Sequence, residues 1–173
     1  MYPHEVINIS WNDYGKLCEK LDKDIGNGLA FDSILAIARG GLPVGVYLAH
    51  RRGLSLFVIS ARCYKEYKEG PMVTICPQIA GVGKLGKNIL LVDEINATGK
   101  TILAVKEHLR KGYEINYIKT AVLINKSRSA VKPDYHVVDI PADKEHQWFR
   151  FPYERPVVPQ TIHHFDFSKQ FKL

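Results

Sequence analysis

The chain has 173 residues, of which 46% are hydrophobic and 24% are charged, a globular balance that excludes disordered and fibrous proteins. At this length we predict a single domain that spans residues 1–173. The formal net charge is +6, and residues 39–92 alone hold eight basic and two acidic side chains, so we expect an anionic partner.

The first forty residues predict a helix and then a buried strand. Apolar side chains recur at helical spacing through Trp11–Ile25, and either Asn12 or Asp13 could cap this helix. Ser33–Ala38 is a short and almost wholly apolar run, which predicts a strand. A turn at residues 39–41 follows it directly.

The middle of the chain continues this alternation. Helical spacing returns in Leu42–Arg52, and Leu54–Ser60 has the composition of a second strand. A long polar connection that contains several glycines occupies about residues 61–87, and we expect a lid or a hairpin there. Ile89–Val92 is an apolar run bounded by charged residues and predicts a third buried strand.

The remaining elements complete the fold class. Thr101–Lys111 predicts a helix for which Gly112 would be the C-cap. Ile115–Ile124 and Tyr135–Ile140 are rich in residues that favour strands. Strands that alternate with helices at this spacing predict an α/β fold with a parallel sheet covered by helices.

The sequence also indicates the location of the protein and the partners it lacks. Cys18, Cys63 and Cys76 are odd in number and form no C-x-x-C motif, so we expect ordinary thiols in a reducing compartment. The N-terminus has no signal-peptide pattern, and no window reaches about 18 consecutive apolar residues, which predicts a cytoplasmic protein without a membrane partner. Because no block of like charges forms a basic arm, we expect no nucleic-acid partner.

Residues 89–101 carry the strongest functional signal, and they read Ile-Leu-Leu-Val-Asp-Glu-Ile-Asn-Ala-Thr-Gly-Lys-Thr. An apolar strand delivers two adjacent carboxylates, Asp93 and Glu94, to its C-terminal end, and a short Thr/Gly loop opens into a helix. Ligands of open α/β sheets bind at that edge, and backbone N–H groups at a helix N-terminus hold phosphate. Two carboxylates beside a phosphate loop suggest a sugar phosphate as ligand.

Two other interpretations of this stretch are weaker. Gly99-Lys100-Thr101 matches the end of a P-loop, but that pattern needs a glycine at position 94, where this chain has a glutamate. Asp93 and Glu94 could instead merely cap the following helix. That interpretation leaves the Thr-x-Gly-x-Thr turn directly behind two carboxylates unexplained.

The stretch resembles the phosphoribosyl pyrophosphate motif of type I phosphoribosyltransferases. Ala38-Arg39-Gly40-Gly41 resembles the pyrophosphate loop of that family. Residues 133–141, with Trp148 before Pro152-Tyr153-Glu154, resemble the base-binding region of its xanthine-guanine and hypoxanthine-guanine branch. The resemblance implies a mainly parallel sheet flanked by helices, with a flexible loop at about 61–87 and a C-terminal hood at about 126–155.

The resemblance also implies roles for individual residues on the sugar side. Asp93 and Glu94 would hold the ribose hydroxyls, and their charge would favour a developing oxocarbenium ion. Arg39 would act on the pyrophosphate together with Ala38 and the Gly40 amide, where glycine permits strained backbone and close approach. In the family the peptide bond before the Arg39 position is often cis. The 5-phosphate would be cradled by Ala97, Thr98, Gly99, Lys100 and Thr101.

The metal and base sites follow from the same resemblance. Mg²⁺ would bridge substrate oxygens near Asp93 and Glu94, and Glu154 could hold a second ion through water. Lys126 resembles the lysine that donates to the exocyclic oxygen of a 6-oxopurine, although Asn125 competes for that role. Trp148 would stack on the purine, with core packing as the alternative for its ring. Phe149 would offer backbone contacts.

One residue departs from the branch that the chain otherwise resembles. The 6-oxopurine enzymes usually carry an aspartate before the Thr-Gly, and this chain has Ala97 there. The predicted function is a magnesium-dependent purine phosphoribosyltransferase of nucleotide salvage, with a 6-oxopurine favoured as acceptor. The alternatives are an adenine or other-base enzyme and a non-catalytic regulator that senses phosphoribosyl pyrophosphate or a nucleotide. Family members are usually dimers or tetramers, so a homodimer or homotetramer is expected.

Overall fold

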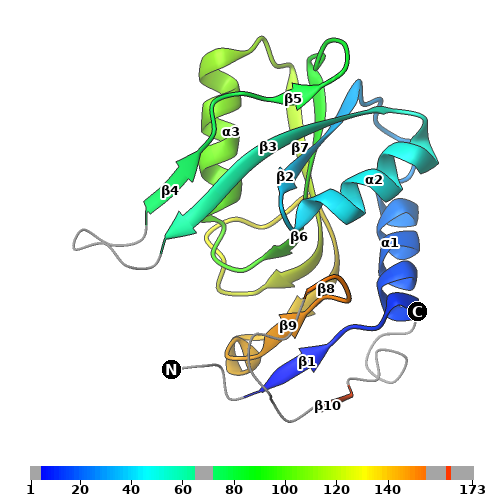
Figure 1. The fold of residues 1–173 in the computed structure, drawn as a ribbon, viewed down its shortest axis with the longest axis vertical. Helices are drawn as coiled ribbons and strands as arrows, with labels where there is room; N and C mark the ends of the chain where they lie inside the picture. The colour runs from blue at the N-terminus through cyan, green and yellow to red at the C-terminus, as the bar shows by residue number, and fades with distance from the viewer. Residues whose placement is uncertain (1–4, 65–71, 155–162, 165–173) are drawn as a thin grey trace.

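Strands and helices alternate along most of the chain (Figure 1). The structure is a computed structural model and describes residues 5–64, 72–154 and 163–164. The helices are α1 (Trp11–Ile25), α2 (Gly41–Arg52), α3 (Lys100–Gly112) and a 3₁₀ turn at Ala142–Lys144. The strands are β1 (Val6–Asn8), β2 (Ser33–Ala38), β3 (Ser55–Tyr64), β4 (Met72–Ile75), β5 (Ala80–Gly81), β6 (Asn88–Asn96), β7 (Tyr117–Lys126), β8 (Tyr135–Ile140), β9 (Trp148–Arg150) and β10 (His163–His164).

The main sheet has seven strands in the order β4-β3-β2-β6-β7-β8, with β5 pairing to β3. The strands β3, β2, β6, β7 and β8 are parallel to their neighbours, whereas β4 and β5 run antiparallel to β3. The prediction of an α/β fold with a mainly parallel sheet is therefore confirmed. Because β2 and β6 are central, their carboxyl ends meet in the middle of one edge of the sheet.

Helices cover both faces of this sheet. The apolar side chains of α1 and α2, among them Leu17, Leu21 and Leu48, pack on the same face of β2, β6 and β7. Those of α3, such as Val105 and Leu109, pack on the opposite face. Figure 1 shows α3 and the α1–α2 pair on opposite sides of the strands. This burial on both faces explains why the central strands read as continuous apolar runs.

Several predicted boundaries need correction. Ser10, and neither Asn12 nor Asp13, is the N-cap of α1, because its Oγ accepts a hydrogen bond from the Asp13 amide at 3.1 Å. Gly112 lies inside α3, and Tyr113 is the C-cap. The strand predicted at Ile89–Val92 runs on to Asn96, so the two carboxylates lie within β6 instead of after it.

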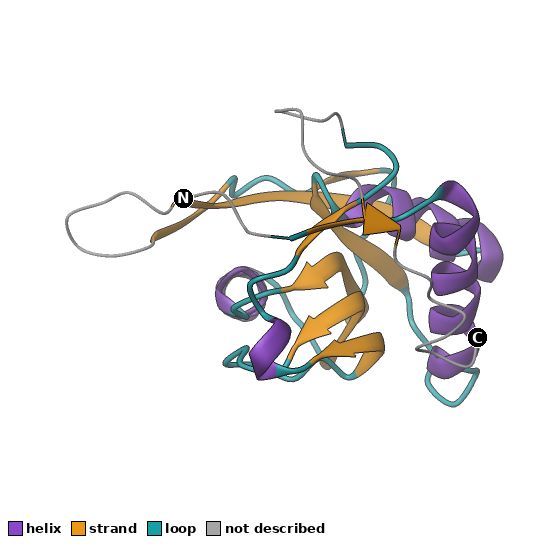
Figure 2. Ribbon diagram, turned by 90° about the horizontal axis from the view of Figure 1, so that it is seen from below, coloured by secondary structure: helices purple, strands orange, loops and turns teal. Residues whose placement is uncertain are grey.

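The predicted connection at about 61–87 contains an antiparallel hairpin. The strand β3 extends to Tyr64 and pairs with β4, with Ala61 opposite Ile75. Figure 2 shows this pair of strands reaching away from the rest of the sheet. Of the two forms predicted for this connection, the described residues therefore show the hairpin. Residues 65–71 lie outside the described part, and the flexibility expected of the loop stays a prediction.

A second, three-stranded parallel sheet has the order β10-β1-β9. It brings β1 from the N-terminal segment beside β9, where Val6 lies opposite Trp148. The strand β1, which was not predicted from the sequence, thus pairs with a strand from the predicted hood at about 126–155. This sheet lies beyond the carboxyl ends of β2 and β6 (Figure 1). None of the helices described is long and apolar enough to span a membrane.

Candidate functional site

Asp93 and Glu94, here called the acidic pair, lie near the carboxyl end of the central strand β6. The preceding residues Leu90, Leu91 and Val92 are fully buried between the helices, which fixes the position of the strand end. Asp93 lies opposite Val122 of β7 and accepts a hydrogen bond from the Glu94 amide at 2.9 Å. Both side chains are half-buried. The fold therefore places two adjacent carboxylates where parallel sheets bind their ligands.

The surroundings of the acidic pair disfavour two negative charges. Burial raises the pKa of Asp93 to about 8, and the charge of Glu94 adds to the rise. Burial also raises the pKa of Glu94 to about 7; the hydrogen bond from Tyr153 and the charge of Arg39 act against this rise. A cation or a set of hydroxyl donors bound here would stabilise the charged forms.

The turn at residues 38–41 lies directly beside the acidic pair. The peptide bond between Ala38 and Arg39 is cis, as the resemblance implied. A Cβ on Gly40 would overlap the carboxyl group of Glu94, so only glycine fits beneath that side chain. The expectation of strained backbone at Gly40 is wrong, since its φ of −62° and ψ of −38° are ordinary helical values. Close approach alone explains this glycine.

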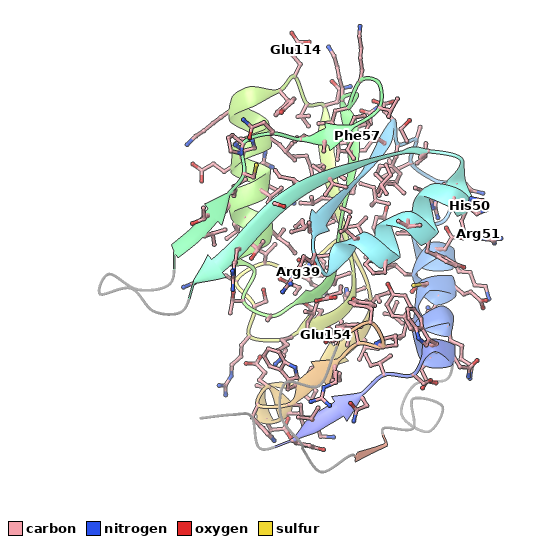
Figure 3. All side chains as sticks on the ribbon, in the orientation of Figure 1. Arg39, His50, Arg51, Phe57, Glu114 and Glu154 are labelled. Carbon is pink, nitrogen blue, oxygen red and sulfur yellow. The ribbon has the colours of Figure 1, made fainter. Side chains whose placement is uncertain are left out.

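Arg39 and Glu154 have opposite effects on the pKa of Glu94. The Arg39 guanidinium lowers the pKa of Glu94 and the Glu154 carboxylate raises it, so both charges act at the site. Figure 3 shows Arg39 at the end of β2 and Glu154 on the segment that follows β9. Arg39 is exposed. Its position allows a bound anion to reach both the guanidinium and the 38–41 turn.

The loop at residues 97–101 connects β6 to the N-terminus of α3. Gly99 has a φ of 78°, and a Cβ there would lie 2.7 Å from the Ser129 Oγ. Glycine is therefore required by both backbone conformation and space. Ala97, Thr98 and Lys100 are exposed, and Thr101 is half-buried. The loop presents accessible backbone at a helix N-terminus, as a phosphate site needs.

The two candidates for the base contact differ in their partners. Asn125 is only 5% exposed; its carbonyl oxygen accepts from Asn96 at 2.8 Å and its amide nitrogen donates to Asp139 at 2.8 Å. The Lys126 ammonium donates to the carbonyls of Glu145 and Gln147 at 2.6 and 3.0 Å. The oxygen and the nitrogen of the Asn125 amide thus both have side-chain partners, whereas Lys126 joins β7 to the segment that leads into Trp148.

A pocket of about 630 Å³ opens at the carboxyl ends of β7 and β8. Its lining includes both Asn125 and Lys126 together with Ser129, Lys132 and Asp139, but neither Trp148 nor Phe149. Trp148 is 48% exposed, so the alternative of plain core packing is wrong for it. Phe149 is buried in the core against α1 and β8, which leaves its backbone as the part able to meet a ligand.

Two features of the site were not singled out from the sequence. The Tyr153 hydroxyl donates to Glu94 Oε2 and lies 3.2 Å from the Gly40 carbonyl oxygen. Asn96 is 2% exposed and accepts a hydrogen bond from the Ser129 hydroxyl at 3.1 Å. For Tyr153 the only available signal was its place in Pro152-Tyr153-Glu154. Asn96 was visible only as one residue of the stretch 89–101, beyond the strand end predicted at Val92.

The basic side chains that give residues 39–92 their positive charge do not all lie near the acidic pair. Arg51 and Arg52 form ion pairs with Asp22 near the far end of α2. Lys87 pairs with Glu114 before the start of β6, at the opposite end of that strand from Glu94. These three residues therefore lie away from the acidic pair, whereas the charge of Arg39 acts on Glu94. Lys65 and Lys68 lie outside the described residues.

The donor set at the acidic pair fits a magnesium ion that the substrate helps to hold. Across residues 5–64, 72–154 and 163–164, no group of three or more His, Cys, Asp or Glu side chains could hold a metal alone. Magnesium is usually bound by one or two carboxylates with substrate phosphates and waters, and the acidic pair offers such oxygens. Glu154 already accepts a hydrogen bond from the Phe151 amide at 2.8 Å.

Comparison with known proteins gives consistent matches over most of the chain. Residues 9–157 match the phosphoribosyl transferase domain family. A xanthine-guanine phosphoribosyltransferase from Chromohalobacter salexigens is 28% identical, over 89% of this chain and 87% of that protein. The crystal structure of a purine phosphoribosyltransferase from Pyrococcus horikoshii has a TM-score of 0.73 and 29% identity, over 90% of this chain and 99% of that one. The transcriptional regulator GfcR 2 of Methanosarcina barkeri is 27% identical, over 61% of this chain and 56% of its own length.

Proposed function

This chain belongs to the phosphoribosyl transferase domain family and is a phosphoribosyltransferase, and from that premise we propose that it is a purine phosphoribosyltransferase of nucleotide salvage. The reaction moves the 5-phosphoribosyl group from phosphoribosyl pyrophosphate to a 6-oxopurine, namely xanthine, guanine or hypoxanthine. The bond from ribose C1 to pyrophosphate oxygen breaks, and a bond from C1 to a purine nitrogen forms. The acidic pair beside the 97–101 loop is the observation that carries this proposal.

On the sugar side, the acidic pair would hold the two ribose hydroxyls. Carboxylates accept hydrogen bonds from hydroxyls, and their charge opposes the positive charge that grows on the sugar in the transition state. The 5-phosphate would bind the backbone N–H groups of the loop, with Thr98 and Thr101 as hydroxyl donors. The loop and the acidic pair are joined by only two residues, so sugar and phosphate would be held as one rigid unit.

On the leaving-group side, the Arg39 guanidinium and the Gly40 amide would meet the pyrophosphate. Arg39 is exposed beside Glu94, so a ligand held by the acidic pair places its pyrophosphate within reach of the 38–41 turn. The carboxylate oxygens of Asp93 and Glu94 would hold Mg²⁺, which would supply positive charge to the phosphate oxygens. A second ion would use Glu154 through water.

On the base side, Lys126 is favoured over Asn125 as the contact to the exocyclic oxygen of the purine. The Asn125 amide is held by Asn96 and Asp139, whereas the Lys126 ammonium donates to the Gln147 carbonyl, directly before the exposed Trp148. Trp148 would stack on the purine ring, and the Phe149 backbone would contact its edge. A 6-oxopurine fits this site because its oxygen accepts from an ammonium, which the amino group of adenine cannot do.

Ala97 bears on how the purine proton is handled. Its methyl side chain cannot accept a proton, so the purine nitrogen gives up its proton to a group other than residue 97. An adenine enzyme is the alternative within the same reaction class.

A non-catalytic regulator is a second candidate, favoured by the match to a named transcriptional regulator over 61% of the chain. Such a protein would keep the acidic pair and the 97–101 loop for sensing. Catalysis would also need Arg39 and Gly40 to bind the leaving pyrophosphate, and both lie beside the acidic pair. Their presence favours the enzyme.

The experiment that separates these candidates is incubation with phosphoribosyl pyrophosphate, Mg²⁺ and one base at a time. The bases are xanthine, guanine, hypoxanthine, adenine and uracil, and the nucleotide product is measured by chromatography. We expect turnover with a 6-oxopurine. Turnover with adenine alone would move the assignment within the enzyme class. Tight binding of phosphoribosyl pyrophosphate without any turnover would establish the regulator instead.

A further inference from the structure

Tyr153 joins three parts of the site that lie far apart in the sequence. It belongs to the segment after β9, and its hydroxyl contacts the Glu94 carboxylate on β6 and the Gly40 carbonyl at the start of α2. A tyrosine hydroxyl has one proton to donate, and a carboxylate is a stronger acceptor than a carbonyl. The contact to Glu94 is therefore the principal one.

The ring of Tyr153 is held by other aromatic side chains. It stacks on Phe151 with a centroid distance of 5.7 Å and an interplanar angle of 10°. It also meets the edge of Tyr14 at 5.8 Å and lies 6.4 Å from Trp11. Because the ring is packed on several sides, its hydroxyl has a fixed position rather than a choice of rotamers.

The other side of Glu94 is bounded by backbone. Gly40 lies so close to the carboxyl group that a Cβ there would overlap it. The Glu94 side chain is thus confined between the Gly40 turn and the Tyr153 hydroxyl. A glutamate without such partners samples several rotamers, and a ligand would have to order it at a cost in binding free energy.

We propose that Tyr153 is a positioning residue, which holds the Glu94 carboxylate over Gly40 in the orientation that binds the ribose hydroxyls of phosphoribosyl pyrophosphate. The inference rests on the proposed function, because it assigns Glu94 to that substrate. Tyr153 itself need not touch the substrate. Its effect on the ligand passes through Glu94.

The test is a double-mutant cycle on the affinity for phosphoribosyl pyrophosphate with Mg²⁺, measured by titration calorimetry. Tyr153→Phe keeps the aromatic packing and removes only the hydroxyl. With Glu94 present we expect this change to weaken binding about tenfold, the scale of one hydrogen bond to a charged group. In the Glu94→Ala background the same change should alter the affinity less than about twofold, since no carboxylate remains to be positioned.

A purely structural role predicts a different pattern. Equal losses in both backgrounds, or no loss in either, would overturn the inference. Tyr14→Phe is the matched control, because Tyr14 belongs to the same aromatic cluster, whereas the hydroxyl that donates to Glu94 is that of Tyr153. We expect its affinity to equal that of the wild type. In steady-state kinetics Tyr153→Phe should raise KM for phosphoribosyl pyrophosphate and leave KM for the purine unchanged.

The same double-mutant cycle, measured on the free energy of unfolding in urea, tests the contact between Tyr153 and Glu94 without relying on the proposed function. The contact exists in the ligand-free protein, so Tyr153→Phe and Glu94→Ala should be non-additive in stability as well. Additive losses of stability would show that the contact does not form. A wild type that binds phosphoribosyl pyrophosphate but turns over no base would overturn the enzyme assignment, and the binding cycle would still decide the role of Tyr153.

Discussion

The two ends of the main sheet carry carboxylates in opposite situations. At the amino ends of the strands, Asp32 accepts hydrogen bonds from the amides of Lys87 and Asn88, and these bonds lower its pKa. Asp134 accepts from the amide and hydroxyl of Thr120 and from Lys119. Burial acts to raise its pKa, but the bonds from Lys119 and Thr120 outweigh that effect and lower it.

At the carboxyl ends, the acidic pair has few such partners. Asp93 accepts one amide and Glu94 one hydroxyl, and burial raises the pKa of both. Satisfied carboxylates at one end join neighbouring strands and stabilise the fold. Unsatisfied carboxylates at the other end lower stability in the free protein, and a ligand can offset that cost. The contrast separates the structural acids from the functional ones.

The largest effect is expected from neutralising the acidic pair. Asp93→Asn combined with Glu94→Gln should reduce nucleotide formation at least about a thousandfold, because the charge that favours the developing cation is removed. The fold should survive, since both replacements are nearly isosteric. The measurements are chromatography of the nucleotide product and circular dichroism. Full activity in this double variant would end the assignment.

A second test places a methyl group at Gly40, in the space that the Glu94 carboxyl group occupies. Gly40→Ala should lower kcat/KM about a hundredfold, because the new methyl group displaces the Glu94 carboxylate from its position beside the turn. The matched control is Gly15→Ala in α1, where a Cβ meets nothing within 4 Å. That control should keep full activity and raise stability by up to about 1 kcal/mol. Equal activity in both variants would contradict the close packing at Gly40.

A smaller effect of the opposite kind is expected at the amino end of the sheet. Asp134→Ala should lower the free energy of unfolding by about 1–2 kcal/mol, because the buried Thr120 amide loses its partner while solvent screens part of the change. Chemical denaturation measures this loss. Activity should stay within about twofold of the wild type. A large loss of activity without loss of stability would erase the distinction between the two ends.

The smallest effect is the pH dependence of stability in the ligand-free protein. The raised pKa values of Asp93 and Glu94 mean that the folded state binds protons more tightly than the unfolded state between about pH 4 and pH 8. The stability they contribute is present below about pH 4 and lost as the pH rises through about 7–8. Because both side chains are only half-buried, solvent screens much of this effect, and we expect the melting temperature to fall by about 3–5 °C over this window.

Variants should distinguish the fall in stability between about pH 4 and pH 8 from the loss of stability below about pH 4. Asp93→Asn with Glu94→Gln should flatten the slope between pH 4 and pH 8. Asp134→Ala should leave that slope alone and weaken the loss of stability below about pH 4, because its lowered pKa contributes stability that disappears on acidification. A wild-type profile that rises through this window would show that the acidic pair is paired in the free protein.

Local signals in the sequence predicted the parts of the fold that depend on periodicity. The run Ser33–Ala38 is β2 with the bounds expected, because a strand that is buried on both faces is apolar over nearly its whole length, and here only Ser33 is polar. The acidic pair, the loop at 97–101 and the turn at 38–41 were likewise visible as departures from apolar runs. The end of β6 was not, because Ile95 and Asn96 continue the pairing with Ile124 and Asn125 beyond the two carboxylates.

The features that sequence reasoning missed depend on contacts between distant segments. The strand β1 forms by pairing with β9, about 140 residues later, and with β10, and three residues give no periodic signal of their own. Tyr153 meets Glu94 across 59 residues, and its hydroxyl has no local sequence pattern. The misplaced cap of α1 has a simpler cause. Ser10 lies one residue before the aromatic Trp11 that was taken as the helix start, and its hydroxyl reaches the Asp13 amide.

The most direct test is a crystal structure of the protein with phosphoribosyl pyrophosphate and Mg²⁺ bound. The account predicts ribose hydroxyls on the carboxylates of Asp93 and Glu94, the 5-phosphate on the amides of residues 97–101 and the pyrophosphate beside Arg39. A ligand bound elsewhere, with the acidic pair still in its ligand-free arrangement, would contradict it.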